Sequence, residues 1–219
     1  MKPYFETDLG KLYNCDCLEF MHIMEDKSVD LVLTDPPYGI NIAKTGKVGG
    51  GKCCEVTDYG KQDWDNKPMS EEQQKTCQRV SKNQIYFGGN YFNLPPSPCW
   101  LVWDKDNTGN FADCELAWTS FNTAVRKFKW RWNGMLQENM KHKEDRVHPT
   151  QKPVPLFMWI LRKYSEDNDL ILDPFLGSGT TAVACEKLGR KWIGIEISEK
   201  YCEIAARRIS AEASQIKLF

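Results

Sequence analysis

The 219-residue sequence has no long apolar run, almost no net charge and no closely spaced cysteine pair of the metal-binding type. A membrane-spanning helix needs about 20 consecutive apolar residues, and no run approaches that length. With 29 Lys+Arg against 30 Asp+Glu, the formal net charge is −1, so the chain as a whole is not a cationic protein built to coat a polyanion. Residues 1–10 are too polar for a signal peptide, and we therefore expect no export.

The cysteines and histidines show no metal-binding pattern. The nine cysteines include no C-x2-C pair, and the three histidines stand at no zinc-finger spacing. An odd number of cysteines cannot all pair within one chain. We therefore expect reduced thiols in a cytoplasmic protein, several of them buried as small apolar side chains, and no bound metal.

Hydrophobic residues make up 41% and charged residues 27%, an ordinary globular composition. The length predicts a single domain over 1–219. Apolar runs predict strands at 30–34, 84–87, 99–103, 170–172 and 191–195, and helical patterns lie at 70–79, 154–164, 180–188 and 198–209. This alternation predicts an α/β fold with a mostly parallel sheet flanked by helices. Two stretches break it: a mobile loop is expected at about 39–67, and a short DNA-recognition insert at about 106–147.

A stiff turn with one carboxylate follows the first expected strand. It consists of Asp35, Pro36, Pro37 and Tyr38, directly after residues 31–34. The two prolines fix two φ angles and remove two N–H donors, and α/β proteins bind ligands at the carboxyl ends of their strands. The Asp35 carboxylate and the Pro36 carbonyl can accept both hydrogens of an amino group on a flat ring, while Tyr38 stacks on that ring. The alternative is a proline-stiffened turn without chemistry.

A glycine-rich turn predicts a nucleoside-containing cofactor. It comprises Asp173, Pro174, Phe175, Leu176, Gly177, Ser178, Gly179, Thr180 and Thr181 and leads into a helix, whose N-terminus offers free N–H groups. Glu196 ends the next strand roughly 20 residues later, where an acidic residue commonly binds ribose hydroxyls. Neither Gly-Lys-Ser/Thr nor G-x-G-x-x-G is present, which disfavours phosphate-loop and nicotinamide sites. The negative Asp173 suits the cationic S-adenosylmethionine; the alternative is a turn without a ligand.

The order of these motifs resembles the permuted beta class of S-adenosylmethionine-dependent DNA amino-methyltransferases, in which the catalytic turn precedes the cofactor turn. Phe87-Gly88-Gly89-Asn90 and Trp103-Asp104-Lys105 match further strand ends of that family. The resemblance covers most of the chain and is closest to short phage, prophage and restriction–modification enzymes. It implies a Rossmann-like methyltransferase fold with a circularly permuted motif order, and methyl transfer to N6 of adenine or N4 of cytosine in double-stranded DNA by base flipping. It leaves a homodimer open.

The resemblance also assigns roles outside the two turns. Asp16 would contact the cofactor's adenine, and the block 148–153 would hold its methionine end, with Lys152 paired to the cofactor carboxylate. Taken singly, Asp16 can be a helix N-cap, His148 a loop residue and Lys152 a solvated lysine. The residues implied for the cofactor are Asp16, Asp35, Thr150, Lys152, Asp173, Pro174, Phe175, Gly177, Ser178, Gly179, Thr180, Thr181 and Glu196.

The near-zero net charge conceals a local basic excess. Residues 124–152 contain eight Lys/Arg against three Asp/Glu, and basic and aromatic residues alternate over 126–132. Candidate phosphate and base contacts are Lys127, Lys129, Arg131 and Trp132. The alternative is a strand with a packed aromatic face and a solvated basic face, and such a basic face can itself lie on DNA.

Asp35 favours adenine N6, because N4-cytosine members of the family more often carry Ser at that position; N4-cytosine is the alternative within the class. Asn in place of Asp35 would have indicated a protein-glutamine methyltransferase. A non-catalytic DNA-binding module is a further alternative, but it leaves both the catalytic turn and the cofactor turn unexplained.

Overall fold

The computed structural model describes residues 1–41, 44, 47–48, 57–58, 60, 64–107, 112–133 and 136–215. The main sheet is built from β1 (Phe5–Glu6), β2 (Gly10–Asn14), β3 (Val29–Thr34), β6 (Ser81–Phe87), β7 (Trp100–Asp104), β8 (Cys114–Thr119), β9 (Arg126–Lys129), β12 (Leu170–Asp173) and β13 (Lys191–Glu196). The helices are α1 (Cys17–His22), α2 (Glu71–Val80), α3 (Val154–Tyr164), α4 (Thr180–Leu188) and α5 (Glu199–Ala213), with a 3-10 turn η2 (Gly89–Tyr91). Two short antiparallel pairs are β4 (Lys47–Val48) with β5 (Thr57–Asp58), and β10 (Trp132–Asn133) with β11 (Leu136–Gln137).

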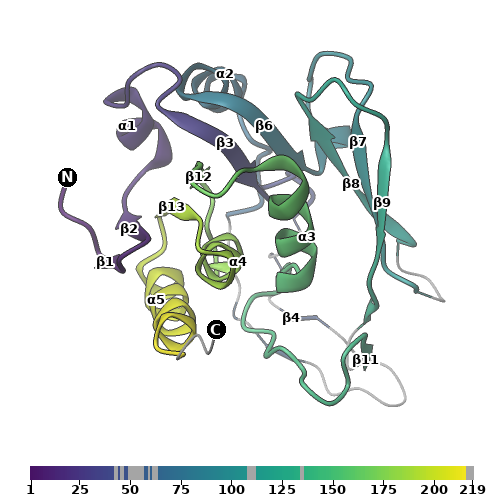
Figure 1. The fold of residues 1–219 in the computed structure, drawn as a ribbon. Coiled ribbons are helices and arrows are strands. Elements are labelled where there is room, and N and C mark those ends of the chain that lie inside the picture. The colour runs from purple at the N-terminus through teal and green to yellow at the C-terminus, as the bar shows by residue number, and fades with distance from the viewer. Residues whose placement is uncertain are drawn as a thin grey trace.

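The main sheet has nine strands in the order β1-β2-β13-β12-β3-β6-β8-β7-β9 (Figure 1). From β2 to β6 all neighbours are parallel. Strand β8 runs antiparallel to both β6 and β7, and β9 is parallel to β7. The predicted α/β fold with a mostly parallel sheet is confirmed. Strand β8 was not predicted, because its exposed and half-buried first residues break the apolar run that marks the other strands.

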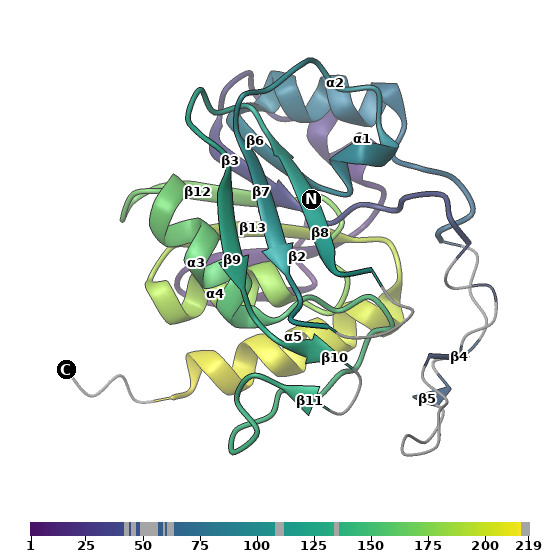
Figure 2. The ribbon, with the colours of Figure 1, turned by 90° about the vertical axis from the view of Figure 1, so that its right-hand side faces the viewer.

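Helices cover both faces of the sheet, with α1 and α2 on one side and α3, α4 and α5 on the other (Figures 1 and 2). Two apolar cores result, one under each helical layer. Local signals set the helix ends as expected. Ser70 and Gln73 form the capping box that begins α2, and α4 ends at Gly189 in the left-handed conformation.

The chain order decides which strands lie side by side. The C-terminal unit β12-α4-β13-α5 places its two strands between β2 and β3, which come from the first part of the chain. The carboxyl ends of β2, β13, β12, β3 and β6 therefore meet at one edge of the sheet. This puts the glycine-rich turn after β12 directly beside the proline turn after β3. The permuted order of the motifs thus produces one site.

Two segments that the sequence sets apart are the expected loop and the expected DNA-recognition insert. Most of the expected loop at 39–67 lies outside the described residues. The expected DNA-recognition insert at about 106–147 contains β8 and β9, which are strands of the main sheet, and the separate pair β10–β11; its role in DNA recognition stays a prediction. No helix within the described part of the chain is long and apolar enough to cross a membrane.

Candidate active site

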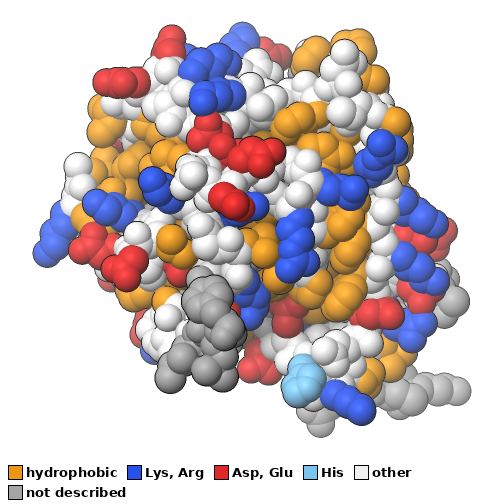
Figure 3. Space-filling view, in the orientation of Figure 1, with side chains coloured by type: hydrophobic (Ala, Val, Ile, Leu, Met, Phe, Trp, Pro, Cys, Tyr) orange, Lys and Arg blue, Asp and Glu red, His pale blue; other side chains and the backbone are white. Residues whose placement is uncertain are grey.

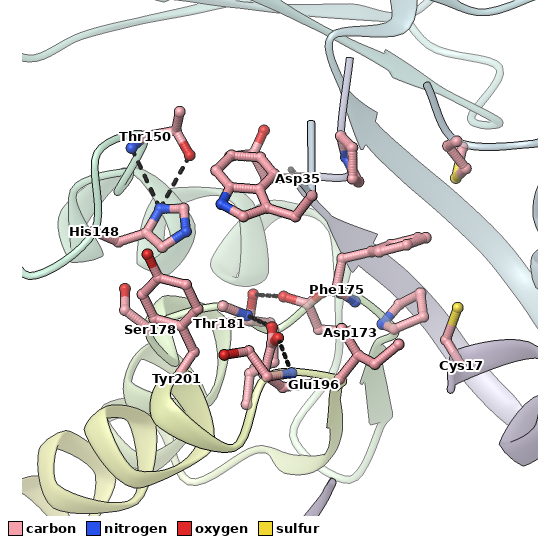
Figure 4. Close-up of a pocket in the computed structure, with 18 of the residues that line it drawn as sticks. Cys17, Asp35, His148, Thr150, Asp173, Phe175, Ser178, Thr181, Glu196 and Tyr201 are labelled. Carbon is pink, nitrogen blue, oxygen red and sulfur yellow. Dashed lines mark hydrogen bonds between the residues drawn. The ribbon is translucent and has the colours of Figure 1, made fainter. Parts of the chain in front are cut away.

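A cavity of about 810 Å³ opens at the carboxyl edge of the parallel strands (Figure 4). Most residues predicted for the site line it: Asp16, Asp35, Pro37, Thr150, Lys152, Asp173, Pro174, Phe175, Gly177, Ser178, Thr180, Thr181 and Glu196. Pro36, Tyr38 and Gly179 are not among the lining residues; they belong to the two turns that shape the walls. The volume falls in the range of small-molecule sites.

The Asp173 carboxylate stabilises the glycine-rich turn through hydrogen bonds within the chain. Oδ1 accepts hydrogen bonds from the Thr34 hydroxyl at 2.6 Å and from the Phe175 N–H at 3.1 Å, and Oδ2 accepts one from the Thr181 hydroxyl. Burial raises the pKa of Asp173 to about 6, although these donors act in the opposite direction. The chain's own groups therefore occupy this carboxylate. Asp173 also lines the cavity, and its predicted role in cofactor binding stays a prediction.

Glycine is required where the turn enters α4. Gly179 has φ +88°, and a Cβ there would lie 3.0 Å from the Cβ of Ala205 in α5. Arg208, also in α5, donates to the Ser178 carbonyl at 2.7 Å and to its hydroxyl at 3.0 Å. Helix α5 thus clamps the turn. No local pattern in the sequence indicated Arg208, which is one of several basic residues on an amphipathic helix.

Glu196 closes the opposite wall of the cavity. Its two carboxylate oxygens accept from the Gly177 N–H at 2.8 Å and the Ser198 N–H at 2.7 Å. Burial raises the pKa of Glu196, and the two backbone donors counter that rise. Because each carboxylate oxygen has two lone-pair sites, these bonds orient Glu196 and leave acceptor capacity for ligand hydroxyls. This is the geometry that ribose recognition needs.

The sequence left open whether Asp16 is a helix N-cap or a residue of the cofactor site, and its position is compatible with both. Its Oδ1 accepts from the Leu18 N–H at 2.7 Å and the Glu19 N–H at 3.2 Å, so it is the N-cap of α1. It also lines the cavity. The cap fixes the carboxylate at the carboxyl end of β2, two strands away from the glycine-rich turn.

Asp35 is held by two donors at the junction of the cavity and the proline turn. The Tyr38 hydroxyl donates to Oδ1 at 2.5 Å, and the Lys152 ammonium donates to Oδ2 at 2.6 Å. Burial raises the pKa of Asp35, and Lys152 opposes that rise. The ring of Tyr38 stacks on Tyr91, with centroids 5.0 Å apart. One face of the predicted stacking platform is therefore already covered.

Lys152 lines the cavity but is buried, and its ammonium is paired with two carboxylates of the chain. It is only 4% exposed, and besides Asp35 its Nζ lies 3.0 Å from Oε2 of Glu115. Burial lowers the pKa of Lys152, but the two carboxylates outweigh it and the net direction is upward. These partners belong to the chain itself, and the pairing of Lys152 with a cofactor carboxylate, implied by the family resemblance, stays a prediction. Glu115 was not predicted, because it lies on the unpredicted strand β8.

Three aromatic side chains that line the cavity contact one another. The imidazole of His148 lies between Trp64 and Tyr201, with ring centroids at 5.2 and 4.5 Å (Figure 4 labels His148 and Tyr201). Its Nδ1 accepts from the Thr150 N–H at 3.3 Å. Burial lowers the pKa of His148 to about 3, with Lys152 adding to the effect, so the ring is neutral at physiological pH. The sequence analysis assigned no role to Trp64 or Tyr201.

The predicted DNA contacts divide into two groups. Lys127, Lys129 and Arg131 are exposed, and each pairs with an acid: Lys127 with Asp104 at 3.3 Å, Lys129 with Asp106 at 2.7 Å, and Arg131 with Asp106. Acidic and basic side chains accordingly lie next to one another on the side where β7 to β9 run (Figure 3).

Trp132 differs from these three cations because it is 6% exposed. Its Nε1 donates to the Gln151 carbonyl at 3.0 Å, and the indole packs in the core under α3. The alternative of a packed aromatic face and a solvated basic face describes this segment. The prediction that Trp132 contacts DNA is corrected: its ring has no surface left for a base or a phosphate.

Comparison with known proteins agrees with this geometry. Residues 58–207 match the family described as DNA methylase, of the N6/N4 methyltransferase type. The chain belongs to this DNA methylase family. The predicted family and fold class are thereby confirmed, and the chain is a DNA methyltransferase.

Similar proteins extend over nearly the whole chain. The Type II methyltransferase M2.DpnII of Streptococcus pneumoniae is 28% identical over 96% of this chain and 93% of its own length. M.HinfI of Haemophilus influenzae is 27% identical over 95% of this chain and 70% of its own. The fold is shared with the M1.HpyAVI–SAM complex, at 23% identity and TM-score 0.57 over 91% of this chain and 100% of that one. It is also shared with the PvuII cytosine-N4-specific DNA methyltransferase, at 19% identity and TM-score 0.65 over 100% and 91%.

Proposed function

We propose that the protein transfers a methyl group from S-adenosylmethionine to N6 of adenine in double-stranded DNA. The observation that carries the proposal is the position of Asp35: its carboxylate is held at the wall of a cofactor-sized cavity, one strand away from the glycine-rich turn. The related Type II methyltransferases and the M1.HpyAVI–SAM complex support the same reaction class.

The residues of the cavity fit the proposed cofactor. Asp16, Asp35 and Glu196 contribute carboxylates to its lining, which suits a ligand that carries a sulfonium and an ammonium group. Glu196 has acceptor capacity for ribose hydroxyls, and Phe175 offers an apolar surface for the adenine. Thr150 and Ser178 supply short polar groups on the side of the cavity nearer to His148, where we place the methionine end.

The chemistry at the target amino group follows from the proline turn. When bound, S-adenosylmethionine supplies an electrophilic methyl group, which leaves the sulfur's bonding electrons behind and joins the nitrogen lone pair. The Asp35 carboxylate and the Pro36 carbonyl accept the two N–H hydrogens, which favours a pyramidal nitrogen and orients its lone pair. One of those protons leaves after transfer, and the Asp35 carboxylate is the nearest acceptor for it.

DNA has to approach with the target base out of the stack, because a base inside the duplex cannot reach the cavity. We place the duplex along the exposed face formed by Lys127, Lys129 and Arg131. For the base to stack on Tyr38, we expect Tyr91, which is 48% exposed, to move aside. Stacking on an aromatic ring offsets part of the cost of extrusion, which is a few kcal/mol.

The test is transfer of tritiated methyl groups from S-adenosylmethionine to duplex DNA, followed by nucleoside analysis. We expect N6-methyladenine; N4-methylcytosine would select the alternative target, and no transfer would refute the function. Asp35→Asn should lower kcat by roughly 100-fold or more while S-adenosylmethionine still binds. Asp30→Asn is the matched control, because Asp30 lies at the far end of the same strand and pairs with Lys82 at 2.6 Å.

A further inference from the structure

Four charged side chains form a continuous ionic chain that ends at the catalytic carboxylate. Lys105 pairs with Oε1 of Glu115, Oε2 of Glu115 lies 3.0 Å from Nζ of Lys152, and that Nζ lies 2.6 Å from Oδ2 of Asp35. Two lysines and two acids sum to zero charge. Lys152 is the least solvated member, with 5% of its side chain exposed, whereas the side chains of Lys105, Asp35 and Glu115 are 18%, 19% and 24% exposed.

The ammonium of Lys152 is surrounded by polar groups of the chain. It donates hydrogen bonds to Asp35 at 2.6 Å and to the Tyr38 hydroxyl at 3.5 Å, and it forms an ion pair with Oε2 of Glu115 at 3.0 Å. These contacts tie Lys152 to the catalytic turn. Among the residues that the structure describes, Glu115 is the acid that pairs with this ammonium from the β8 side.

Strand β8 places Glu115 there. Its register sets Glu115 opposite Trp103 in β7, and the Lys105 ammonium lies 5.1 Å from the Trp103 ring. Glu115 therefore lies between two lysines: it pairs with Lys105 through one carboxylate oxygen and with Lys152 through the other. Trp103 is its neighbour on β7. Glu115 and Lys105 lie outside the proline turn, and neither has a role in the methyl-transfer chemistry proposed above.

Glu115 also changes the strength of Asp35 as an acceptor. Burial raises the pKa of Asp35, Lys152 lowers it, and Glu115 raises it again. A second carboxylate on the same ammonium offsets part of the positive charge that Asp35 experiences. Asp35 then keeps more basicity than it would have in a simple one-to-one ion pair with lysine.

We propose that Glu115 is a positioning residue for methyl transfer: it holds Lys152 beside Asp35 and, by sharing the ammonium, keeps Asp35 a strong acceptor for the target amino group. Lys105 supports Glu115 in this role. The inference rests on the proposed function, since it concerns the same reaction at the same carboxylate.

The test is steady-state methyl transfer by Glu115→Gln across pH. We expect kcat to fall about tenfold or more with the KM for S-adenosylmethionine changed less than about threefold. The titratable groups around Asp35 are Lys152, Glu115, Tyr38 and Asp173, and the neutral His148 lies near Lys152. Removing the negative charge of Glu115 lowers the pKa of Asp35, so the acidic limb of the kcat profile should move to lower pH. A purely structural role would leave that limb in place.

Glu212→Gln is the matched control, because Glu212 is a largely buried glutamate paired with Lys187 far from the cavity; its kcat and acidic limb should match those of the wild type. An unchanged kcat in Glu115→Gln would overturn the inference, and so would a large rise in the KM for S-adenosylmethionine at constant kcat. If Glu115→Gln does not fold, Lys105→Met decides: the inference expects a fall in kcat of about threefold, and no change overturns it. Failure of the wild type to methylate DNA would instead refute the proposed function.

Discussion

The hydroxyl of Thr34 donates a hydrogen bond of 2.6 Å to the carboxylate of Asp173. Thr34 is the last residue of β3 and Asp173 the last of β12, so the bond joins the strand before the proline turn to the strand before the glycine-rich turn. Both residues are buried. The proline turn and the glycine-rich turn are therefore held in place relative to each other by a side-chain hydrogen bond as well as by the pairing of β3 with β12.

The burial of Asp173 predicts a characteristic pH dependence of stability. The pKa of Asp173 is about 6 in the folded protein and 3.8 without the fold's influence, so the folded state binds the proton more tightly. The contribution of this group to stability is therefore greatest below about pH 4 and is lost as the pH rises through about 6, by roughly 2–3 kcal/mol. Asp173→Asn should remove that change. Urea unfolding of both proteins at pH 4.5 and 7.5 measures it, and an identical pH difference in the two would contradict the prediction.

Gly88 should tolerate no side chain. It has φ +66°, and a Cβ there would lie 2.2 Å from the Tyr38 ring, which its bond to Asp35 and its stack on Tyr91 hold in place. We expect Gly88→Ala to lower methyl transfer at least about tenfold and to lower the thermal midpoint.

Gly189→Ala is the control for Gly88→Ala, because it introduces the same kind of backbone strain without a steric clash. Gly189 has φ +67° and no neighbouring atom within 4 Å of the added Cβ, so it experiences strain alone, about 1 kcal/mol. It should remain fully active. Equal effects of the two substitutions in thermal unfolding and activity assays would show that Tyr38 is not constrained by Gly88.

The ion pairs of Lys129 and Arg131 predict that the carboxylate of Asp106 lowers the affinity for DNA. Asp106 pairs with both Lys129 and Arg131, and Asp106→Asn should free these cations and tighten DNA binding. Replacing both cations with Ala should weaken binding and lower the slope of log K against log salt by about 1 for each lost contact. Asp167→Asn makes the same charge change beside Arg190, away from this face, and should have little effect. Unchanged salt slopes in fluorescence anisotropy would place the DNA elsewhere.

Trp132 should matter for stability and not for DNA. Trp132→Phe removes the donor to the Gln151 carbonyl and leaves that acceptor buried, which costs about 1–3 kcal/mol. The salt dependence of DNA binding should match that of the wild type. A lower salt slope with unchanged unfolding would restore Trp132 as a DNA contact.

Local features of this protein follow from its sequence because neighbouring residues determine them. The Ser70 capping box, the Gly189 C-cap, the proline turn at Asp35 and the glycine-rich turn at Asp173 each depend on residues within a few positions along the chain. The motifs also indicate the family, since their types and order suffice for that. For the same reason the central parallel strands β3, β6, β12 and β13 were predictable, because each is a compact apolar run, whereas β2 lacks such a run and was not predicted.

Long-range partners were decided only by the tertiary structure. Asp35 and Lys152 are 117 positions apart, and Glu115 reaches them through an antiparallel strand that carries no strong local pattern. Asp106, just after β7, pairs with cations at and just after the end of β9, and Trp132 faces the core because of the register of its segment. Sequence position does not encode these distances directly: they result from which strands pair, and pairing is settled by packing of the whole sheet.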